Sequence, residues 1–254
     1  MLLAIDMGNT NIVVGCIDNG KIIFDERLGT DLSKTALEYA MGIKAVLELH
    51  QMTPSQFDGA ILSSVVPPLT NIVKVAIEKT IGVNAMVVGP GIKTGLNIKM
   101  DNPRALGADL VVDAVAGINE YGAPLIIIDM GTATTISVID TRSNYIGGMI
   151  VPGVGISVKA LVEKTAQLPD ISLEAPKKAI GTNTIDCMKS GVMLGQASLL
   201  DGLIDRIEEE MGMEVPVVAT GGMARAVIPV CTHNIKLDNE LLLKGLNVIY
   251  NKNA

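Results

Sequence analysis

The chain begins with short apolar runs that are separated by turn residues. Leu2–Asp6 is an apolar run that ends in an acid, which predicts a buried strand, and Asn11–Asp18 predicts a second strand. Asn19-Gly20 is typical of a type I′ hairpin turn, because both central residues of that turn need a positive φ. Lys21–Leu28 then predicts a returning strand, so the chain is expected to open as an antiparallel meander.

The remainder of the first half alternates between helical and extended patterns. A helix is predicted over Lys34–His50 and a strand over Phe57–Ser64. Pro67-Pro68 is expected to break the chain before a helix at Leu69–Ile81, and Val83–Val88 is expected to form one more strand.

The second half of the chain repeats this order of elements, and a predicted helix at Arg104–Tyr121 bridges the two halves. An order of β-β-β-α-β-α that occurs twice predicts an α/β protein of two similar domains with mixed sheets, at residues 1–115 and 116–254. The strands predicted in the second half are Leu125–Asp129, Thr134–Asp140, Tyr145–Val151 and Val215–Thr220, and the helices are Ile156–Thr165, Asn183–Met211 and Glu240–Asn251.

The two halves share one strand-and-loop motif. LLAIDMGNT at Leu2–Thr10 and LIIIDMGTATT at Leu125–Thr135 both end an apolar strand in Asp-Met-Gly. A single glycine after a strand usually marks only a turn, but the repetition favours a function. Glycine lets backbone approach a phosphate, successive N–H groups form an anion nest, and the carboxylate is suited to the accompanying cation. The sequence therefore predicts two loops that hold a nucleoside triphosphate and its metal between the halves.

Composition excludes several classes of function. A net charge of −7 and 2% aromatic residues argue against nucleic-acid binding, which needs clustered cations and stacking platforms. Only two histidines are present, so a histidine-based triad or metal site is not expected. The three cysteines are far apart, so neither a disulfide nor a structural zinc site is expected. No apolar stretch approaches the ~18 residues that a membrane-spanning helix needs. Asp6 interrupts the position of a signal-peptide core, so we expect a cytoplasmic protein that does not bind membranes.

Five motifs, in order along nearly the whole chain, point to a family. They are DMGNTN, NPRALGAD, DMGTATT, GGMIVPG and GTNT followed by SG. With them the chain resembles the type III pantothenate kinases, which belong to the superfamily of acetate kinase, sugar kinases and actin. The resemblance implies duplicated RNase H-like (actin-like ATPase) domains. It also implies phosphoryl transfer from ATP to the primary hydroxyl of pantothenate, the first step of coenzyme A biosynthesis.

The resemblance also assigns roles to residues at the nucleotide. Asp6 is implied to hold Mg²⁺ through water, and Asp129 to bind a monovalent cation, K⁺ or NH₄⁺. Gly131 and Thr132 match the second phosphate loop, whereas Gly221 and Gly222 match a turn on the adenosine side. The first ATP loop is implied to comprise Asp6, Met7, Gly8, Asn9, Thr10, Asn11, Ile12 and Val13.

At the acceptor, the resemblance makes Asp109 the general base. The family is dimeric, so a homodimer is implied, with Gly147–Gly153 in a region that contributes to the interface. The substrate-binding positions that match are Met100, Gly107, Ala108, Asp109, Leu110 and Thr184. A loose phosphoryl transition state needs positioning and charge stabilisation more than covalent help, so one aspartate near the hydroxyl suffices as base.

Asp109 also has a structural interpretation. An acid in the first turns of the Arg104–Tyr121 helix stabilises the helix dipole whether or not it acts in chemistry. Asp113 follows one turn later on the same face, and two neighbouring carboxylates would raise the pKa of one of them. Such a shift would suit a base.

The chain departs from the family pattern around this base. Met100 stands where the family commonly has an aromatic residue, Leu110 where it has arginine, and Asp113 where it often has asparagine. With leucine in place of arginine at position 110, an acidic acceptor loses a natural hydrogen-bond partner. A hydrogen bond to a charged group is worth about 1.5–3 kcal/mol. Lys99 and Arg104 are the nearby cations. Three interpretations stay open: a pantothenate kinase, a sister kinase for another hydroxylated small molecule, or a non-catalytic ATP-binding homologue.

Overall fold

The Asn19-Gly20 hairpin forms as predicted in the computed structural model, which describes all residues 1–254. Both turn residues have positive φ, 48° at Asn19 and 80° at Gly20. The hairpin joins β2 (Asn11–Asp18) to β3 (Lys21–Gly29), and β1 (Leu2–Met7) pairs antiparallel with β2. The N-terminal meander is therefore confirmed.

The chain divides into two units, residues 1–120 with 240–254 and residues 121–239. This division differs from the predicted one in the C-terminal segment, because 240–254 packs with the first unit rather than the second. The reason is α7 (Leu241–Asn251), an apolar helix that places Leu243, Leu246 and Ile249 in the core of the first unit.

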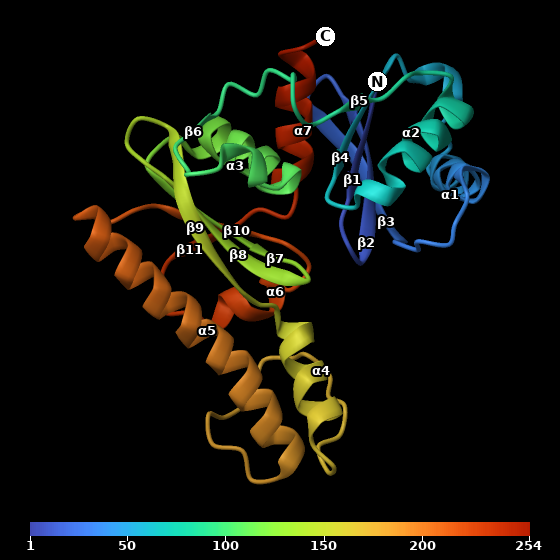
Figure 1. Cartoon of the computed structure of the whole chain (residues 1–254). Helices are drawn as coiled ribbons and strands as arrows, with labels where there is room; N and C mark the ends of the chain where they lie inside the picture. Colours follow the sequence, from blue (N-terminus) through green and yellow to red (C-terminus); the bar gives the residue numbers. More distant parts are fainter. The chain divides into compact units, whose positions relative to one another are not determined.

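The first unit contains a mixed five-stranded sheet in the order β3-β2-β1-β4-β5. Strand β4 (Gly59–Ser64) runs parallel to β1, and β5 (Met86–Val87) runs parallel to β4. Helices α1 (Ala36–Leu49) and α2 (Pro67–Ile81) cover one face, where Leu3, Ile5 and Met7 are buried. Helix α7 covers the other face, on which Leu2 and Ala4 pack (Figure 1). Helix α3 (Ala108–Tyr121) packs against α7 and adds Val112 and Val115 to the same apolar cluster.

The second unit repeats this strand order as β9-β8-β7-β10-β11. Strand β7 (Leu125–Met130) pairs antiparallel with β8 (Ala133–Ile139) and parallel with β10 (Val217–Thr220). Strand β9 (Asn144–Pro152) pairs antiparallel with β8, and β11 (Ile235–Leu237) pairs parallel with β10. The core of this unit packs against α5 (Thr184–Met211), α4 (Val154–Lys164) and the short α6 (Ala224–Val227). The duplicated α/β fold with mixed sheets is therefore confirmed.

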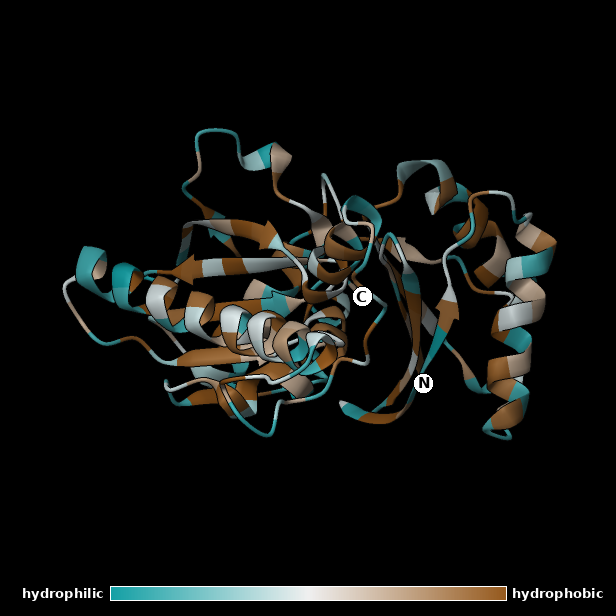
Figure 2. Cartoon of the chain, turned by 90° about the horizontal axis from the view of Figure 1, so that it is seen from below, coloured by the Kyte–Doolittle hydropathy of each residue, from teal (hydrophilic) through white to brown (hydrophobic).

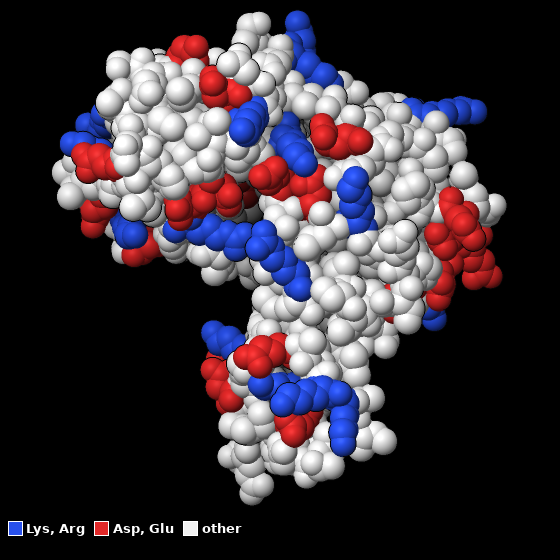
Figure 3. All heavy atoms as spheres, turned by 180° about the vertical axis from the view of Figure 1, so that it is seen from behind, with Lys and Arg blue, Asp and Glu red and all other residues white.

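Four short elements complete the chain: β6 (Asn97–Ile98) and three single 3₁₀ turns at Pro54–Gln56, Pro103–Ala105 and Ile228–Val230. In Figure 2 the strands are largely hydrophobic, whereas the helices carry both kinds of residue, as expected for sheets covered by amphipathic helices. No helix combines the length and the apolar character that a membrane crossing requires. On the face drawn in Figure 3, basic and acidic side chains are interspersed.

Several predicted boundaries were wrong for local reasons. Pro67 and Pro68 begin α2 instead of preceding it, because proline fits the first helical positions, which need no N–H partner. The helix predicted from Arg104 begins at Ala108, after the separate turn at Pro103–Ala105. The strand predicted over Val83–Val88 shrinks to Met86–Val87, and β11 was not predicted.

Candidate active site

The first loop, between β1 and β2, is a tight turn closed by its own backbone. Gly8 N donates to Asn11 O at 3.0 Å, and Thr30 Oγ1 donates to Gly8 O at 2.7 Å. Asn9, Thr10 and Asn11 are exposed on this turn. The side chains of Met7 and Ile12, by contrast, are in the core, so only their backbone is available to a phosphate. The loop predicted from sequence is therefore present, with its polar residues at the surface.

Asp6 lies at the end of β1, beside Ser63 of the parallel strand β4 and Val13 of β2. Residues opposite one another in a sheet point to the same face, and this face also carries Leu2 and Ala4. Ser63 is fully buried, and its hydroxyl has no hydrogen-bond partner. An unpartnered buried hydroxyl beside a carboxylate fits the second sphere of a bound cation, which agrees with a water-mediated Mg²⁺ at Asp6.

Asp109 is the second residue of α3, and its Oδ1 accepts a hydrogen bond from Leu110 N at 2.8 Å. It shares a helix face with Val112 and Asp113, and Val112 belongs to the apolar cluster that also contains Leu2 and Ala4 of β1. Asp109 therefore lies on the same side of the first sheet as Asp6. A Cβ on Gly107 would collide with Asp109 Oδ1, so glycine leaves the space in which this carboxylate lies. The structure gives a reason for both residues of the Gly-Ala-Asp motif.

Burial raises the pKa of Asp109 above its ordinary value, against the opposing effect of the Leu110 N–H. The cause is desolvation and not the charge of Asp113, which was the source expected from the sequence. Asp113 is itself almost completely buried, one turn further along α3. A carboxylate that holds its proton more tightly is a better acceptor for the proton of an alcohol.

The other predicted acceptor residues of the first unit lie around the start of α3. Ala108 and Leu110 flank Asp109 and are half-buried, and Met100 is half-buried in the preceding segment. Lys99 and Arg104, the nearby cations, are exposed.

The second loop, between β7 and β8, surrounds the carboxylate of Asp129. Asp129 lies beside Thr135 of β8 and Thr220 of β10, so the three side chains form one row across adjacent strands. Gly221 has φ of 95°, and a Cβ there would collide with Asp129 Oδ1. Met223 N donates to Met130 O at 3.1 Å, which ties the Gly221-Gly222 turn to the end of β7. The structure therefore brings Gly221 to Asp129, a link that the sequence did not reveal.

The end of β9 packs against this loop. Gly131 and Thr132 are exposed, and a Cβ on Gly153 would collide with the carbonyl oxygen of Thr132. The GGMIVPG segment at Gly147–Gly153 thus supports the second loop through its last glycine.

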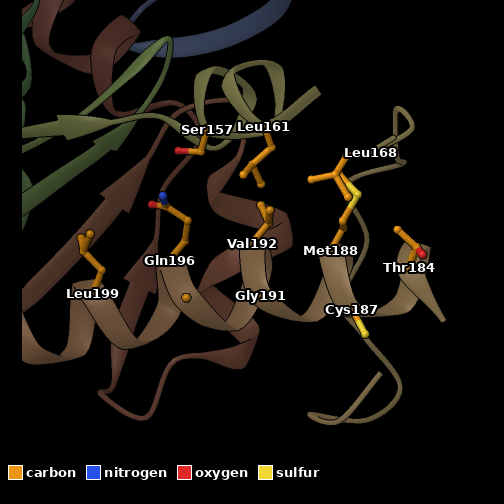
Figure 4. A pocket seen from close by; sticks show the side chains of 11 residues that line it. Ser157, Leu161, Leu168, Thr184, Cys187, Met188, Gly191, Val192, Gln196 and Leu199 are labelled. Atoms are coloured by element: carbon orange, nitrogen blue, oxygen red, sulfur yellow. The ribbon is translucent and has the colours of Figure 1, made fainter. Parts of the chain in front are cut away.

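Thr184 lies elsewhere in the second unit, at the exposed start of α5. It lines a cavity of about 600 Å³ between α4 and α5, into which Leu161, Met188 and Val192 point (Figure 4). None of the residues that line this cavity belongs to the row around Asp129. The structure does not bring Thr184 to the second loop.

The sequence prediction omitted Ser63 and Thr220, and it quoted Thr135 only as part of a motif. A signal was available, because AILS at 60–63 and VVAT at 217–220 are corresponding segments that both end in a hydroxyl residue. Alignment of the two halves beyond the Asp-Met-Gly strand would have found it.

Comparison with solved structures identifies the fold. A putative 2-dehydro-3-deoxygalactonokinase from Sinorhizobium meliloti aligns with a TM-score of 0.63 over 100% of this chain and 97% of its own, at 11% identity. A putative Baf family transcriptional activator from Campylobacter jejuni aligns with a TM-score of 0.59 at 19% identity, covering 99% of this chain and 98% of its own. At these identities the likeness concerns the fold alone.

Sequence comparison identifies the family. The family model of type III pantothenate kinase matches residues 2–206. A type III pantothenate kinase from an Exiguobacterium species is 45% identical over 253 residues, covering 100% of this chain and 99% of the relative. One from Halalkalibacterium halodurans is 43% identical and covers 100% of both chains. The chain therefore belongs to the type III pantothenate kinase family.

Proposed function

We propose that this protein transfers the γ-phosphoryl group of ATP to the primary hydroxyl of pantothenate, with Asp109 as general base. The observation that carries this proposal is the half-buried Asp109 carboxylate at the start of α3, with a pKa raised by desolvation and the space that Gly107 leaves for it. A protein that only bound ATP would gain nothing from a desolvated carboxylate at this position, because its burial opposes ionisation.

The residues divide the work as follows. Asp109 accepts the proton of the attacking hydroxyl. The backbone of the first loop, with Asn9, Thr10 and Asn11 at the surface, binds phosphate oxygens, as do Gly131 and Thr132 of the second loop. When bound, Mg²⁺ and a monovalent cation would supply charge stabilisation to the phosphoryl group. Asp6 would hold the Mg²⁺ through water, and Asp129 would bind the monovalent cation.

The acceptor pocket is part of this proposal. Met100, Gly107, Ala108, Leu110 and Thr184 are assigned to pantothenate. Because Leu110 cannot pair with the carboxylate of pantothenate, that role falls to Lys99 or Arg104, which are exposed near the start of α3.

A homodimer in the cytoplasm completes the proposal. Exposed apolar side chains on β9, α4 and α5 support a dimer through the second unit; they include Ile150 at 74% exposure and Ile156, Leu161 and Ile185. Exposed apolar surface of this kind marks an interaction site. The three cysteines are free, which is typical of a reducing compartment.

The test is a coupled ATP assay with Mg²⁺ and K⁺ against a panel of hydroxylated acceptors that includes pantothenate. Turnover on pantothenate is expected. Turnover only on another alcohol would show that this alcohol, and not pantothenate, is the acceptor. Nucleotide binding with no turnover on any acceptor would refute the proposal that the protein is a kinase.

A further inference from the structure

The duplicated halves differ in the side chains that flank their loop carboxylates. In the first unit the row across three strands reads Val13, Asp6, Ser63. In the second unit the corresponding row reads Thr135, Asp129, Thr220. Asp6 thus has a hydroxyl on one side and an apolar side chain on the other, whereas Asp129 lies between two hydroxyls.

From this row we propose that Thr135 and Thr220 are further ligands of the monovalent cation at Asp129 and make the site selective for a large monovalent ion. The inference rests on the proposed function only in taking Asp129 as a cation site. It adds two residues whose side chains no motif assigns to that site.

The hydroxyl of Thr135 is buried and has no hydrogen-bond partner. Leaving a buried hydroxyl unpaired costs about 1–3 kcal/mol, and a valine would fill the same space without that cost. A buried hydroxyl without a partner is not sufficient evidence of a cation site by itself. The hydroxyl of Thr134 is also buried and without a partner, but it lies on the opposite, core face of β8 with Ile136 and Val138. The distinguishing feature of Thr135 is its place beside a carboxylate.

Thr220 closes the other side of the row. It is buried, with 5% of its surface exposed, and it ends β10 directly before Gly221. Because Gly221 has no Cβ, its backbone passes close to Asp129 Oδ1. The carboxylate therefore lies between two hydroxyl-bearing side chains, with the backbone of Gly221 close to it.

The charge and chemistry of the row fit a monovalent ion. One carboxylate and two neutral hydroxyls carry a net charge of −1, and neutral oxygens replace the hydration shell of K⁺ effectively. Mg²⁺ instead keeps several of its waters and binds through one or two carboxylates. The row at Asp6, where Val13 offers no oxygen, is suited to that second mode. The asymmetry of the two halves thus assigns each ion to its own half.

Valine substitutions test the proposal, because valine has the shape of threonine without the hydroxyl. The first measurement is the melting temperature of the full chain by circular dichroism, in KCl and in choline chloride at equal ionic strength without substrates. The second is the K⁺ concentration that half-activates turnover. Thr135→Val and Thr220→Val are expected to lose most of the K⁺-dependent rise in melting temperature and to need roughly tenfold more K⁺.

The matched control is Thr134→Val, which removes a buried, unpartnered hydroxyl from the same strand but from the opposite face. It should respond to K⁺ as the unmodified protein does. Thr135→Ser and Thr220→Ser keep the hydroxyl and should retain the response. Should a valine variant fail to fold, Tl⁺ can replace K⁺ in crystals of the unmodified protein, where its anomalous signal is expected among Thr135, Asp129 and Thr220.

The proposal is overturned if both valine variants keep the normal response to K⁺, if K⁺ does not stabilise the unmodified protein, or if Tl⁺ binds elsewhere. Failure of the proposed function looks different. In that case pantothenate is not phosphorylated, while the K⁺-dependent melting temperatures still follow the pattern of the variants.

Discussion

At the residue scale, Asp109, the proposed general base, illustrates how a group suited to catalysis can oppose stability. Its carboxylate is half-buried in space that Gly107 leaves free, and its pKa is raised by desolvation. The same position in a purely structural role would favour an exposed acid that stabilises the helix N-terminus and stays easily ionised. The burial therefore favours chemistry over helix capping as the reason for this residue.

Asp109→Asn should leave the protein at least as stable as the unmodified chain at pH 7. A raised pKa means that the folded protein binds the proton more tightly than the unfolded chain does. The free energy of unfolding contributed by Asp109 is therefore fully present below about pH 4, the ordinary pKa of aspartate, and falls as the pH rises through the higher folded pKa. Urea unfolding of both proteins between pH 4 and pH 8 measures this. A clear loss of stability in the variant at pH 7 would show that the Asp109 carboxylate stabilises the fold.

Leu110→Arg should lower the KM for pantothenate by roughly tenfold or more, because it supplies a cation for the substrate carboxylate at the position directly after Asp109. Leu110→Lys is the control for charge without the planar guanidinium. Steady-state kinetics at saturating ATP measures the effect. No change in KM with either variant would remove position 110 from the acceptor pocket.

At the element scale, local signals explain where helices begin. Thr35 caps α1 through a capping box, in which Glu38 Oε2 accepts a hydrogen bond from Thr35 N at 2.8 Å and Thr35 Oγ1 accepts one from Glu38 N. Proline at the first positions sets the start of α2 in the same local way. These starts depend on three or four neighbouring residues, so the sequence contains their signals, although the predicted helices began at Lys34 and Leu69 instead of Ala36 and Pro67.

Thr35→Ala should reduce the free energy of unfolding by about 1 kcal/mol, because it leaves an N-terminal N–H of α1 without its acceptor. Activity should be unchanged, since α1 covers the face of the first sheet opposite Asp6 and Asp109. Thr35→Ser keeps the cap and serves as the control. Chemical denaturation and turnover, measured together, check both statements, and a loss of turnover without a loss of stability would contradict them.

The strand rows show why part of the site could not be predicted. The Asp-Met-Gly loops, Asp109 and Gly221 are local motifs, and the family resemblance found them. Alignment of the two halves can pick out Ser63 and Thr220 as hydroxyl residues on corresponding strands, but it does not say which residues lie beside them. Cross-strand register places Thr220 beside Asp129, which is 91 residues away in sequence (220 − 129). Register depends on tertiary pairing, which the apolar pattern of one strand does not contain.

At the scale of the whole molecule, the C-terminal helix belongs to the first unit and not to the half in which the chain ends. Gly245 lets α7 approach α3 closely, since a Cβ there would collide with the carbonyl of Val112. Leu243, Leu246 and Ile249 fill the core between these helices and the sheet. An apolar helical pattern identifies such a helix, but it does not reveal which sheet the helix covers.

Leu246→Ala should destabilise the protein by about 2–5 kcal/mol, because it opens a cavity at a fully buried position. Hydrogen–deuterium exchange should increase in β1 and β4 of the first unit much more than in β7 and α5 of the second. Leu200→Ala, a fully buried position of α5, should give the reverse pattern. Faster exchange confined to the second unit in Leu246→Ala would contradict the assignment of α7.

The most direct test of the central claim is the mass of the product formed by the purified protein from ATP and pantothenate, with Mg²⁺ and K⁺ present. The account predicts phosphorylated pantothenate from the unmodified chain and none above background from Asp109→Asn, although that variant remains folded. Unphosphorylated pantothenate after incubation with the unmodified protein, or equal product from Asp109→Asn, would contradict it.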